Sequence, residues 1–259
     1  MAVDERSNTS DASKTAGGEQ GEGFPSVWTR PQRRKREQPT LSRDQIVAGA
    51  LALLDRDGVE ALSMRKLGTH LQVGATSMYS HVTNKEELIE LVVDEVYGEV
   101  EVPEATGPDD WRPAVEHLAH SLRAAVLRHP WMASVLGELG MSSLGPHMMR
   151  FSDRALGVFE AAGFDDPNEA DVLMSAVIAY VVGTALTEAA FVTTLARSGR
   201  TEQEWADQVV PAALAAAEPF PRLKRRYEAV TDTNATSVRG SSFDEGLACV
   251  LDGVAARLR

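Results

Sequence analysis

Cysteine is almost absent from this sequence: Cys249 is the only one among 259 residues. A single thiol excludes a disulfide bond within the chain, which fits a reducing compartment. The amino terminus also lacks the charged, apolar and small-residue regions that make up a secretory signal. We therefore expect a cytoplasmic protein.

Long hydrophobic runs are missing too. The longest nearly apolar stretch extends from Val172 to Leu186. Ser175 and Thr184 interrupt it, and Glu188 follows soon after it. A helix needs about 20 predominantly apolar residues to cross a bilayer. This stretch therefore predicts a buried helix and no membrane partner.

Alternating patterns and enzyme motifs are also absent. We find no internal repeat, and no segment alternates apolar and polar residues for long enough to predict a sheet. The sequence has no Gly-rich phosphate loop, no Gly-x-Ser-x-Gly turn and no zinc-protease helix. These absences favour an all-α fold without catalysis, cofactor or metal. An all-α enzyme is the rival hypothesis from another class.

Acidic residues outnumber basic ones, and the net charge of −12 would by itself argue against nucleic-acid binding. The distribution of charge changes that conclusion. Residues 30–85 contain ten basic and five acidic side chains, whereas residues 86–259 contain 14 basic and 28 acidic ones. Because phosphate repels acidic surfaces, this asymmetry predicts a small basic module joined to an acidic body.

The first 40 residues contain little that could form a core. Residues 1–23 consist largely of Gly, Ser, Thr and charged residues, which predicts disorder. A basic cluster follows: Arg33, Arg34, Lys35 and Arg36. We interpret residues 1–40 as a disordered, basic N-terminal arm. Such an arm either contacts a neighbouring minor groove of DNA or serves only as a solubilising tail.

Helical spacing predicts a DNA-binding domain over residues 41–85. Ser42 and Gln45 form a capping box that opens the first helix, and Gly58 is suited to end it. Ser63 caps a second helix of two turns. The spacing of apolar residues gives both helices an inward face.

The link after the second helix contains Gly74 as its small residue, and a third short helix is expected over residues 75–81. Met78 is an apolar anchor beneath this helix. Two short helices joined by a tight turn, after a helix that shares their core, are typical of a helix-turn-helix. The run from Asn84 to Glu87 is a capping box for a fourth helix over residues 84–98.

Residues 41–97 carry a recognisable pattern. Its most specific marks are Gly58-Val59, Ser63-Met64-Arg65-Lys66-Leu67, Met78-Tyr79-Ser80-His81-Val82 and Asn84-Lys85. This segment resembles the amino-terminal domain of the tetracycline-repressor (TetR) family. A weaker match, which ends in Phe243-Asp244-Glu245-Gly246-Leu247, resembles the regulatory domain of the same family. The resemblance implies an all-α dimer that leaves its operator DNA when a small molecule binds.

The resemblance also implies which residues contact DNA. Arg65, at the start of the second helix, falls where the family contacts bases or nearby phosphates. The contact positions of the recognition helix correspond to Ala75, Thr76, Ser77, Tyr79, Ser80 and His81. Small hydroxyl groups can form hydrogen bonds with phosphates or with several different base pairs. They therefore position the protein on DNA more than they specify the base sequence. Tyr79 and His81 are expected to hold phosphates; the alternatives are that Tyr79 packs and that His81 caps the helix.

Lys85 is informative without the resemblance. A lysine in the first turn of a helix opposes the helix dipole. A phosphate docked at this terminus would be attracted both by the lysine and by the free backbone N–H groups. We therefore interpret Lys85 as a phosphate clamp.

Residues 86–259 are expected to form a helical regulatory and dimerisation domain. Helices are predicted at about 111–128, 131–139, 146–162, 166–197, 201–217 and 242–258, with a long connection over 218–241. The final helix has an apolar stripe: Phe243, Leu247, Val250, Leu251, Val254 and Leu258. The long helix gathers small residues that favour close packing: Ala176, Ala179, Gly183 and Ala190. In the resembling family, helices at these two places form a four-helix bundle between protomers, so we expect a homodimer.

Aromatic, flexible and polar side chains between these helices are candidates for an effector pocket. They are His117, His120, Trp131, Met132, Met148, Phe151, Met174, Tyr180, Glu188 and Phe191. The alternative for each is ordinary core packing, and for His117 and His120 a metal pair beside Glu116. The histidine on which the tetracycline repressor's magnesium site depends falls near Leu136, which argues against that chemistry.

These features predict a ligand-responsive, sequence-specific DNA-binding transcriptional regulator, a repressor that a small hydrophobic molecule releases from its operator. Effector binding between the core helices would shift the helix at 84–98 and change the spacing of the two DNA-binding domains. The alternative is a ligand-independent DNA-binding or architectural protein.

Overall fold

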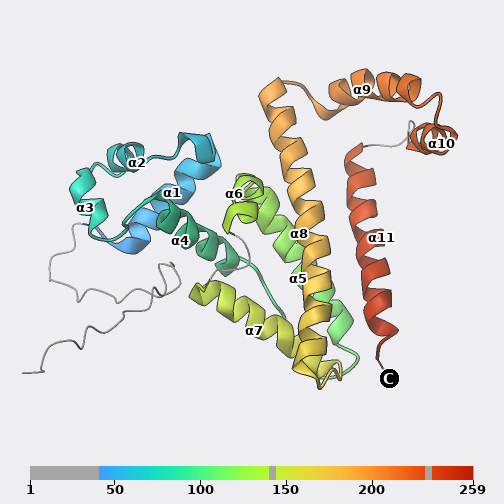
Figure 1. The fold of residues 1–259 in the computed structure, drawn as a ribbon, viewed down its shortest axis with the longest axis horizontal. Helices are drawn as coiled ribbons and strands as arrows, with labels where there is room; N and C mark the ends of the chain where they lie inside the picture. The colour runs from blue at the N-terminus through green and yellow to red at the C-terminus, as the bar shows by residue number, and fades with distance from the viewer. Residues whose placement is uncertain (1–40, 140–143, 231–234, 259) are drawn as a thin grey trace, which may run out of the picture.

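The computed structural model describes residues 41–139, 144–230 and 235–258 (Figure 1). The expectations for the N-terminal arm, Arg33 to Arg36 included, lie outside the described residues. All regular structure within these ranges is helical, which confirms the predicted all-α fold. In chain order the elements are α1 (Arg43–Asp57), the 3-10 helix η1 (Val59–Ala61), α2 (Met64–His70), α3 (Ala75–Tyr79), α4 (Lys85–Gly98), α5 (Trp111–Arg128), α6 (Met132–Leu139), α7 (Pro146–Ala161), α8 (Pro167–Ser198), α9 (Glu202–Ala216), α10 (Pro221–Val230) and α11 (Ala235–Ala255).

The first helix, α1, begins and ends where its capping residues predict. The Ser42 side chain accepts a hydrogen bond from the Gln45 backbone N–H at 3.1 Å, and the Gln45 side chain accepts one from the Ser42 N–H at 2.9 Å. Gly58 follows the helix with a φ of 74°, and its N–H donates to the Leu54 carbonyl. A glycine adopts this φ without the steric cost that a Cβ would add.

Apolar side chains from the first three helices share one core with α4. Ile46, Ala50, Leu67, Met78 and Val82 each have 0% of their surface exposed. Full burial of a side chain as large as those of Ile46, Leu67, Met78 and Val82 contributes roughly 1.5–3 kcal/mol relative to exposure. Met78 therefore anchors α3 from beneath, as the sequence predicts.

The turn between α2 and α3 contains the predicted Gly74, but the left-handed residue of the turn is a different one. Gln72, rather than Gly74, has the left-handed backbone, with a φ of 57°. Gly74 has a φ of −69° and precedes α3 as its N-cap residue, and a Cβ added there would meet nothing within 4 Å. The left-handed position thus falls on an exposed, unbranched side chain that tolerates it, and the small size of Gly74 is not needed for close packing.

At the N-terminus of α4, one of the two hydrogen bonds of the predicted capping box is present. The Asn84 side chain accepts a hydrogen bond from the Glu87 backbone N–H at 2.7 Å. The Glu87 carboxylate, however, accepts the backbone N–H of Thr83 at 2.8 Å, one residue before the cap. Two backbone N–H groups near the start of α4 are therefore satisfied by side chains, as a helix N-terminus requires.

Helices α5, α7, α8 and α11 form the body of the carboxy-terminal region (Figure 1). α5 packs against α7 and α8, and α11 lies along α8. The helices predicted between residues 111 and 197 are confirmed to within one residue at each end that the structure describes. The apolar stripe of α11 is buried inside its own protomer, because Phe243, Leu247, Leu251 and Val254 are each less than 5% exposed.

The connection predicted over residues 218–241 is wrong. α10 occupies Pro221–Val230, and α11 begins at Ala235, well before the predicted residue 242. Proline is tolerated in the first turn of a helix, where its missing N–H has no intrahelical partner, so Pro221 starts α10 instead of preventing it. The polar beginning of α11 was missed because apolar spacing starts only at Phe243.

α8 is longer than its apolar run suggests. It is a 32-residue helix that is long and apolar enough to cross a membrane by length and composition, and 33% of its most apolar window is buried within the protomer. One face of α8 packs against α5, α7 and α11. The opposite face leaves Ala176, Ala179, Gly183 and Ala190 exposed.

Candidate DNA-binding surface and effector domain

α3 presents short polar side chains on its outer face. Ser77 and Ser80 are exposed and His81 is half-buried, while Tyr79 is 54% exposed. Ala75 and Thr76 form the start of the helix. Because Met78 is fully buried on the opposite side, the orientation of α3 is fixed and its outer face is open to a partner. Because about half of Tyr79 is buried, its ring can pack against the protein while its hydroxyl group reaches a partner, so both interpretations of Tyr79 remain open.

The hydroxyl group of Ser80 is already engaged. It donates a hydrogen bond to the Ser77 carbonyl oxygen at 2.7 Å. A phosphate oxygen only accepts hydrogen bonds, so Ser80 has to rotate before it can hold a phosphate. In its present rotamer it can accept from a base amino group.

Arg65 and its neighbours differ in their electrostatic surroundings. Lys66 forms an ion pair with Asp57 at 2.8 Å, and Arg56 contacts the same carboxylate at 3.0 Å. Hydrogen bonds from Arg56 and Lys66 hold the pKa of Asp57 well below its usual range. Arg65 is exposed, and within the described part of the chain its guanidinium has no ion-pair partner. Arg65 is therefore available to DNA without the loss of an ion pair, unlike its neighbour Lys66.

The predicted phosphate clamp, Lys85, lies against the protein. Its ammonium group donates a hydrogen bond to the Val59 carbonyl at 3.0 Å and is partly buried. This contact fastens the start of α4 to η1. An ammonium has three N–H donors, so the contact with Val59 leaves donors for a phosphate. The clamp role remains a prediction.

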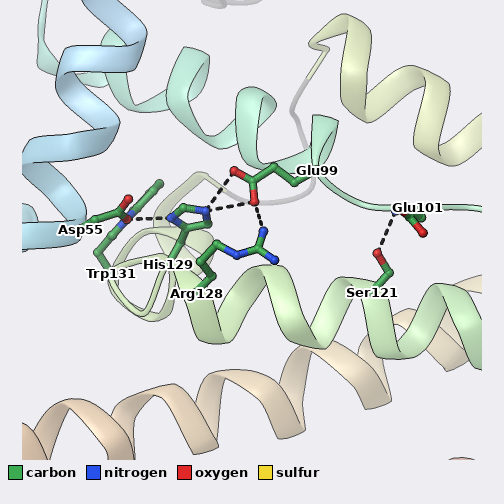
Figure 2. A network of polar contacts seen from close by, with 7 residues as sticks. All are labelled: Asp55, Glu99, Glu101, Ser121, Arg128, His129 and Trp131. Atoms are coloured by element: carbon green, nitrogen blue, oxygen red, sulfur yellow. Dashed lines mark hydrogen bonds and ion pairs between the residues drawn. The ribbon is translucent and has the colours of Figure 1, made fainter.

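His129 is the centre of a polar network between the amino-terminal helices and the rest of the molecule (Figure 2). The side chain is only 3% exposed. Its Nδ1 lies 2.7 Å from Oδ1 of Asp55, at the end of α1, and its Nε2 lies 3.2 Å from Oε1 of Glu99, which follows α4. Carboxylates only accept hydrogen bonds, so both contacts are hydrogen bonds when both ring nitrogens carry protons.

Two further side chains complete this network. The indole N–H of Trp131 donates to the same Asp55 oxygen at 2.8 Å, and Arg128 forms an ion pair with Glu99 (Figure 2). The network joins three segments that are distant in sequence: α1, the end of α4, and the corner between α5 and α6. Trp131, predicted in the effector pocket, is thus placed at this joint.

A second joint connects α4 with α7. Asp94 on α4 is 2% exposed and accepts hydrogen bonds from the backbone N–H groups of His147 at 3.1 Å and Met148 at 2.9 Å. These N–H groups lie in the first turn of α7 and have no partner within the helix. The helix dipole also favours a negative charge at this end. Gly145 permits the approach, because a Cβ on it would lie 2.0 Å from Oδ1 of Asp94.

A third polar cluster lies between α5, α8 and α11. Arg123 and Glu188 form two parallel hydrogen bonds of 2.9 Å each, and both side chains are more than four-fifths buried. The Arg123 guanidinium also lies 4.9 Å from the centre of the Phe243 ring. The Tyr180 hydroxyl donates to the Phe243 carbonyl at 2.8 Å, and the ring of His120 lies 5.4 Å from that of Phe243. Three of the predicted pocket residues therefore meet here.

The remaining predicted pocket residues are spread over the molecule. His117 is exposed and lies 3.0 Å from a Glu101 oxygen, Phe191 contacts Trp205 of α9, and Phe151 contacts Tyr97 of α4. Met132 is buried, whereas Met148 and Met174 are partly buried against the core. His117 and His120 have different acidic partners, Glu101 and Asp244. This arrangement does not support the alternative of a metal pair beside Glu116.

Sequence reasoning missed the residues that join the helices. Asp55, Asp94 and Glu99 look like ordinary surface carboxylates in the sequence, and His129 stands next to a proline at a helix end. Arg123 carried a usable signal, because it follows His120 by three residues and so lies on the same face of α5. The buried carboxylate Asp94 also stands between apolar residues of α4, where a solvated charge is not expected.

Comparisons with known proteins agree with this architecture. Residues 46–92 match the family model of bacterial regulatory proteins of the tetR family, and residues 102–258 match that of the tetracyclin repressor-like C-terminal domain. An HTH-type transcriptional regulator of Saccharopolyspora erythraea is 42% identical over 64% of this chain and 70% of its own length. The HTH-type transcriptional repressor DrrR1 of Streptomyces coeruleorubidus is 32% identical over 84% of this chain and 78% of its own.

Solved structures show the same fold. ActR of Streptomyces coelicolor in complex with actinorhodin has a TM-score of 0.66 and 31% identity, with 83% of this chain and 97% of ActR covered. BioQ bound to its double-stranded DNA operator has a TM-score of 0.52 and 27% identity, with 61% of this chain and 93% of BioQ covered. The helix-turn-helix, the large helical body and these matches together establish that the chain belongs to the TetR family and is a DNA-binding transcriptional regulator.

Proposed function

We propose that this protein is a homodimeric, cytoplasmic repressor that binds an operator through α3 and leaves it when a small hydrophobic molecule binds to the helical body. The observation that carries the proposal is the outer face of α3, where exposed short polar side chains and Tyr79 lie above the buried anchor Met78. The repressor DrrR1, the actinorhodin complex of ActR and the operator complex of BioQ support it by relationship. We propose no catalytic activity.

The proposed DNA contacts are those that the sequence predicts. Ser77, Tyr79 and Ser80 would face the major groove, with Arg65 on an adjacent phosphate or base edge. Ala75 and Thr76 would begin the recognition helix closest to the bases, and His81 and Lys85 would hold phosphates at its far end. Arg33 to Arg36 would add contacts in the neighbouring minor groove.

Dimerisation would use the small-residue faces of α8 and α11. Ala176, Ala179 and Gly183 are exposed on α8, and Cys249 and Gly253 are exposed on α11. Small residues allow helix backbones to approach closely, and a two-fold axis would place two recognition helices one DNA turn apart. The Ala179→Arg variant should sediment as a monomer, whereas Ala124→Arg on the exposed face of α5 should remain dimeric. A dimeric Ala179→Arg protein would contradict this interface.

The effector would bind between α5, α7 and α8. We propose that Met148, Phe151 and Met174 supply apolar surface there and that Tyr180, Glu188 and His120 add polar contacts from the cluster between α5, α8 and α11. Trp131 would instead connect the effector domain to α1, and His117 would connect α5 to the loop before it. Met132 and Phe191 would pack against the residues that line the pocket.

Residues 41–85 and 86–259 are the two proposed domains, and α4 is the connector between them. Its start is bound to η1 through Lys85, its middle to α7 through Asp94, and its end to His129 through Glu99. An effector that separates α7 from α5 would displace Asp94 and hence α4. Such an effector has to bind the two arrangements with different affinity.

Selection of bound sequences from random duplex DNA tests the DNA-binding part of the proposal and yields the operator. Spin labels placed on α3 of both protomers then test the coupling. A ligand that releases the operator should change the distance between the two labels. If every releasing ligand left that distance unchanged, the proposed role of α4 would be wrong.

A further inference from the structure

A small groove lies between the end of α4 and the outer side of α7. Tyr97, Gly98, Val100, Val102, His147, Arg150, Phe151 and Arg154 line it, and its volume is about 80 Å³. About 10–15 Å³ measured in this way is enough for one water molecule, so the groove has room for a group of a few heavy atoms, such as a carboxylate or a phosphate.

The polar lining of this groove is cationic. His147, Arg150 and Arg154 follow one another at helical spacing and therefore share one face of α7. Both arginines are exposed. Two like charges four residues apart on a helix destabilise each other unless an anion neutralises them.

In the part of the chain that the structure describes, Arg150 and Arg154 lack the acidic partners that several arginines of the regulatory body have. Arg112, Arg123 and Arg128 each form an ion pair with a carboxylate. Across residues 41–139, 144–230 and 235–258, neither Arg150 nor Arg154 has an ion pair or side-chain hydrogen bond. Other exposed arginines, such as Arg197, also have no ion pair among the described residues, but Arg150 and Arg154 lie together on one groove.

The backbone helps to shape the groove. A Cβ on Gly98 would lie 2.7 Å from Nδ1 of His147, so the absence of a side chain lets the imidazole rest on the end of α4. Tyr97 and Phe151 pack together beside it, with ring centres 5.4 Å apart. The contacts of His147 with Gly98 and of Phe151 with Tyr97 thus hold this face of α7 against the end of α4.

We propose that this groove binds a small oxyanion, the carboxylate or phosphate group of a metabolite, through Arg150, Arg154 and His147. Two guanidinium groups present parallel N–H donors that match the geometry of such anions. The bound anion would bridge α7 to the end of α4, next to the contact of Asp94 with the first turn of α7. It would thereby stabilise the present arrangement of the two helices, which the proposed effector would disturb.

Thermal unfolding of the full-length protein without DNA tests this site directly. Sodium phosphate and sodium acetate are titrated separately against sodium chloride of matched ionic strength. One of the two anions should raise Tm in a saturable manner, and which anion does so identifies phosphate or carboxylate as the preferred group. If neither raises Tm above the chloride control, the proposal is wrong.

Variants locate the site. Arg150→Gln/Arg154→Gln should weaken the apparent affinity for the anion at least about tenfold, because two charge-assisted hydrogen-bonding groups are removed. Arg197→Gln, an exposed arginine at the end of α8, is the matched control and should behave as wild type. An unchanged anion response in the double variant, with a wild-type Tm in chloride, would place the anion elsewhere and refute the site. This outcome is separate from a failure of operator binding, since no DNA is present.

Discussion

The outer face of α3 and the joints of α4 are built in opposite ways. Ser77 and Tyr79 on α3 are exposed. At the joints, Asp94 and His129 are almost completely buried and each has two partners. A surface that binds a partner keeps its polar groups in water until the partner arrives, whereas a buried polar group needs its partners within the fold.

This difference separates the effects expected of substitutions. Changes on the outer face of α3 should affect operator binding and leave stability unchanged. Changes at the α4 joints should reduce stability and also weaken the response of DNA binding to the effector. Changes in the core beneath α3 should be dominated by the loss of folding free energy.

The largest effect is expected for Met78→Ala. Removing this fully buried side chain should lower the free energy of unfolding by about 2–5 kcal/mol, because it leaves a cavity between α3 and α2. Urea denaturation measures the change. The adjacent variant Tyr79→Ala, on the exposed side, should stay within about 0.5 kcal/mol of wild type. Equal losses in both variants would show that α3 is oriented differently.

Asp94→Ala comes next. It leaves the partly buried N–H groups of His147 and Met148 without their acceptor, so the free energy of unfolding should fall by about 1–3 kcal/mol. Gly145→Ala should have a similar effect, since its Cβ would collide with the same carboxylate. Asp153→Ala, at an exposed position of α7, is the control. Wild-type stability of both test variants in urea would contradict the joint.

His129→Ala should destabilise the protein less, by about 1–2 kcal/mol, because Asp55 keeps the indole N–H of Trp131 and Glu99 keeps Arg128. Its more specific effect is on coupling. The ratio of operator affinities with and without effector should shrink relative to wild type, as titration of both ligands would show. A destabilised variant with an unchanged ratio would mean that His129 only holds the fold together.

A smaller effect is expected for the removal of single hydroxyl groups from α3. Ser77→Ala and Tyr79→Phe should each weaken operator binding by about 0.5–1.5 kcal/mol, while Tm stays constant. Fluorescence anisotropy at fixed salt measures the affinity. A fall in Tm without a fall in affinity would assign these hydroxyls to the fold instead.

The smallest effect is expected from the arm. Deletion of residues 1–36 should weaken operator binding and flatten its dependence on salt, by a slope of about 0.9 for each phosphate that the arm neutralises. The slope is obtained from operator affinities over a series of salt concentrations. An unchanged slope would identify the arm as a solubilising tail.

The sequence was most informative where local chemistry decides the structure. The capping box of Ser42 and Gln45 and the glycine after α1 depend on neighbouring residues alone, and both are confirmed. The same holds for α5, whose predicted limits, 111 and 128, agree with the structure. Amphipathic spacing also identified Met78 as an anchor, because its burial follows from one helix face.

The sequence was less informative where distant segments meet. The partners of His129 are Asp55 and Glu99, separated from it by 74 and 30 residues, and no local pattern connects them. For the same reason the predicted effector residues include Trp131, whose partner is Asp55 of α1. α10 was missed because prolines were taken as breaks, although Pro221 occupies the first position of a helix.

Competitive binding measures most directly whether the outer face of α3 reads DNA sequence. The full-length protein is titrated with the operator obtained by selection and with a scrambled duplex of equal length, at the same salt concentration. We predict that the operator binds at least about 10³-fold more tightly, and that a Ser77→Ala/Tyr79→Phe variant loses part of this preference while its Tm stays constant. Equal affinity for both duplexes would contradict the assignment of α3 as the recognition helix.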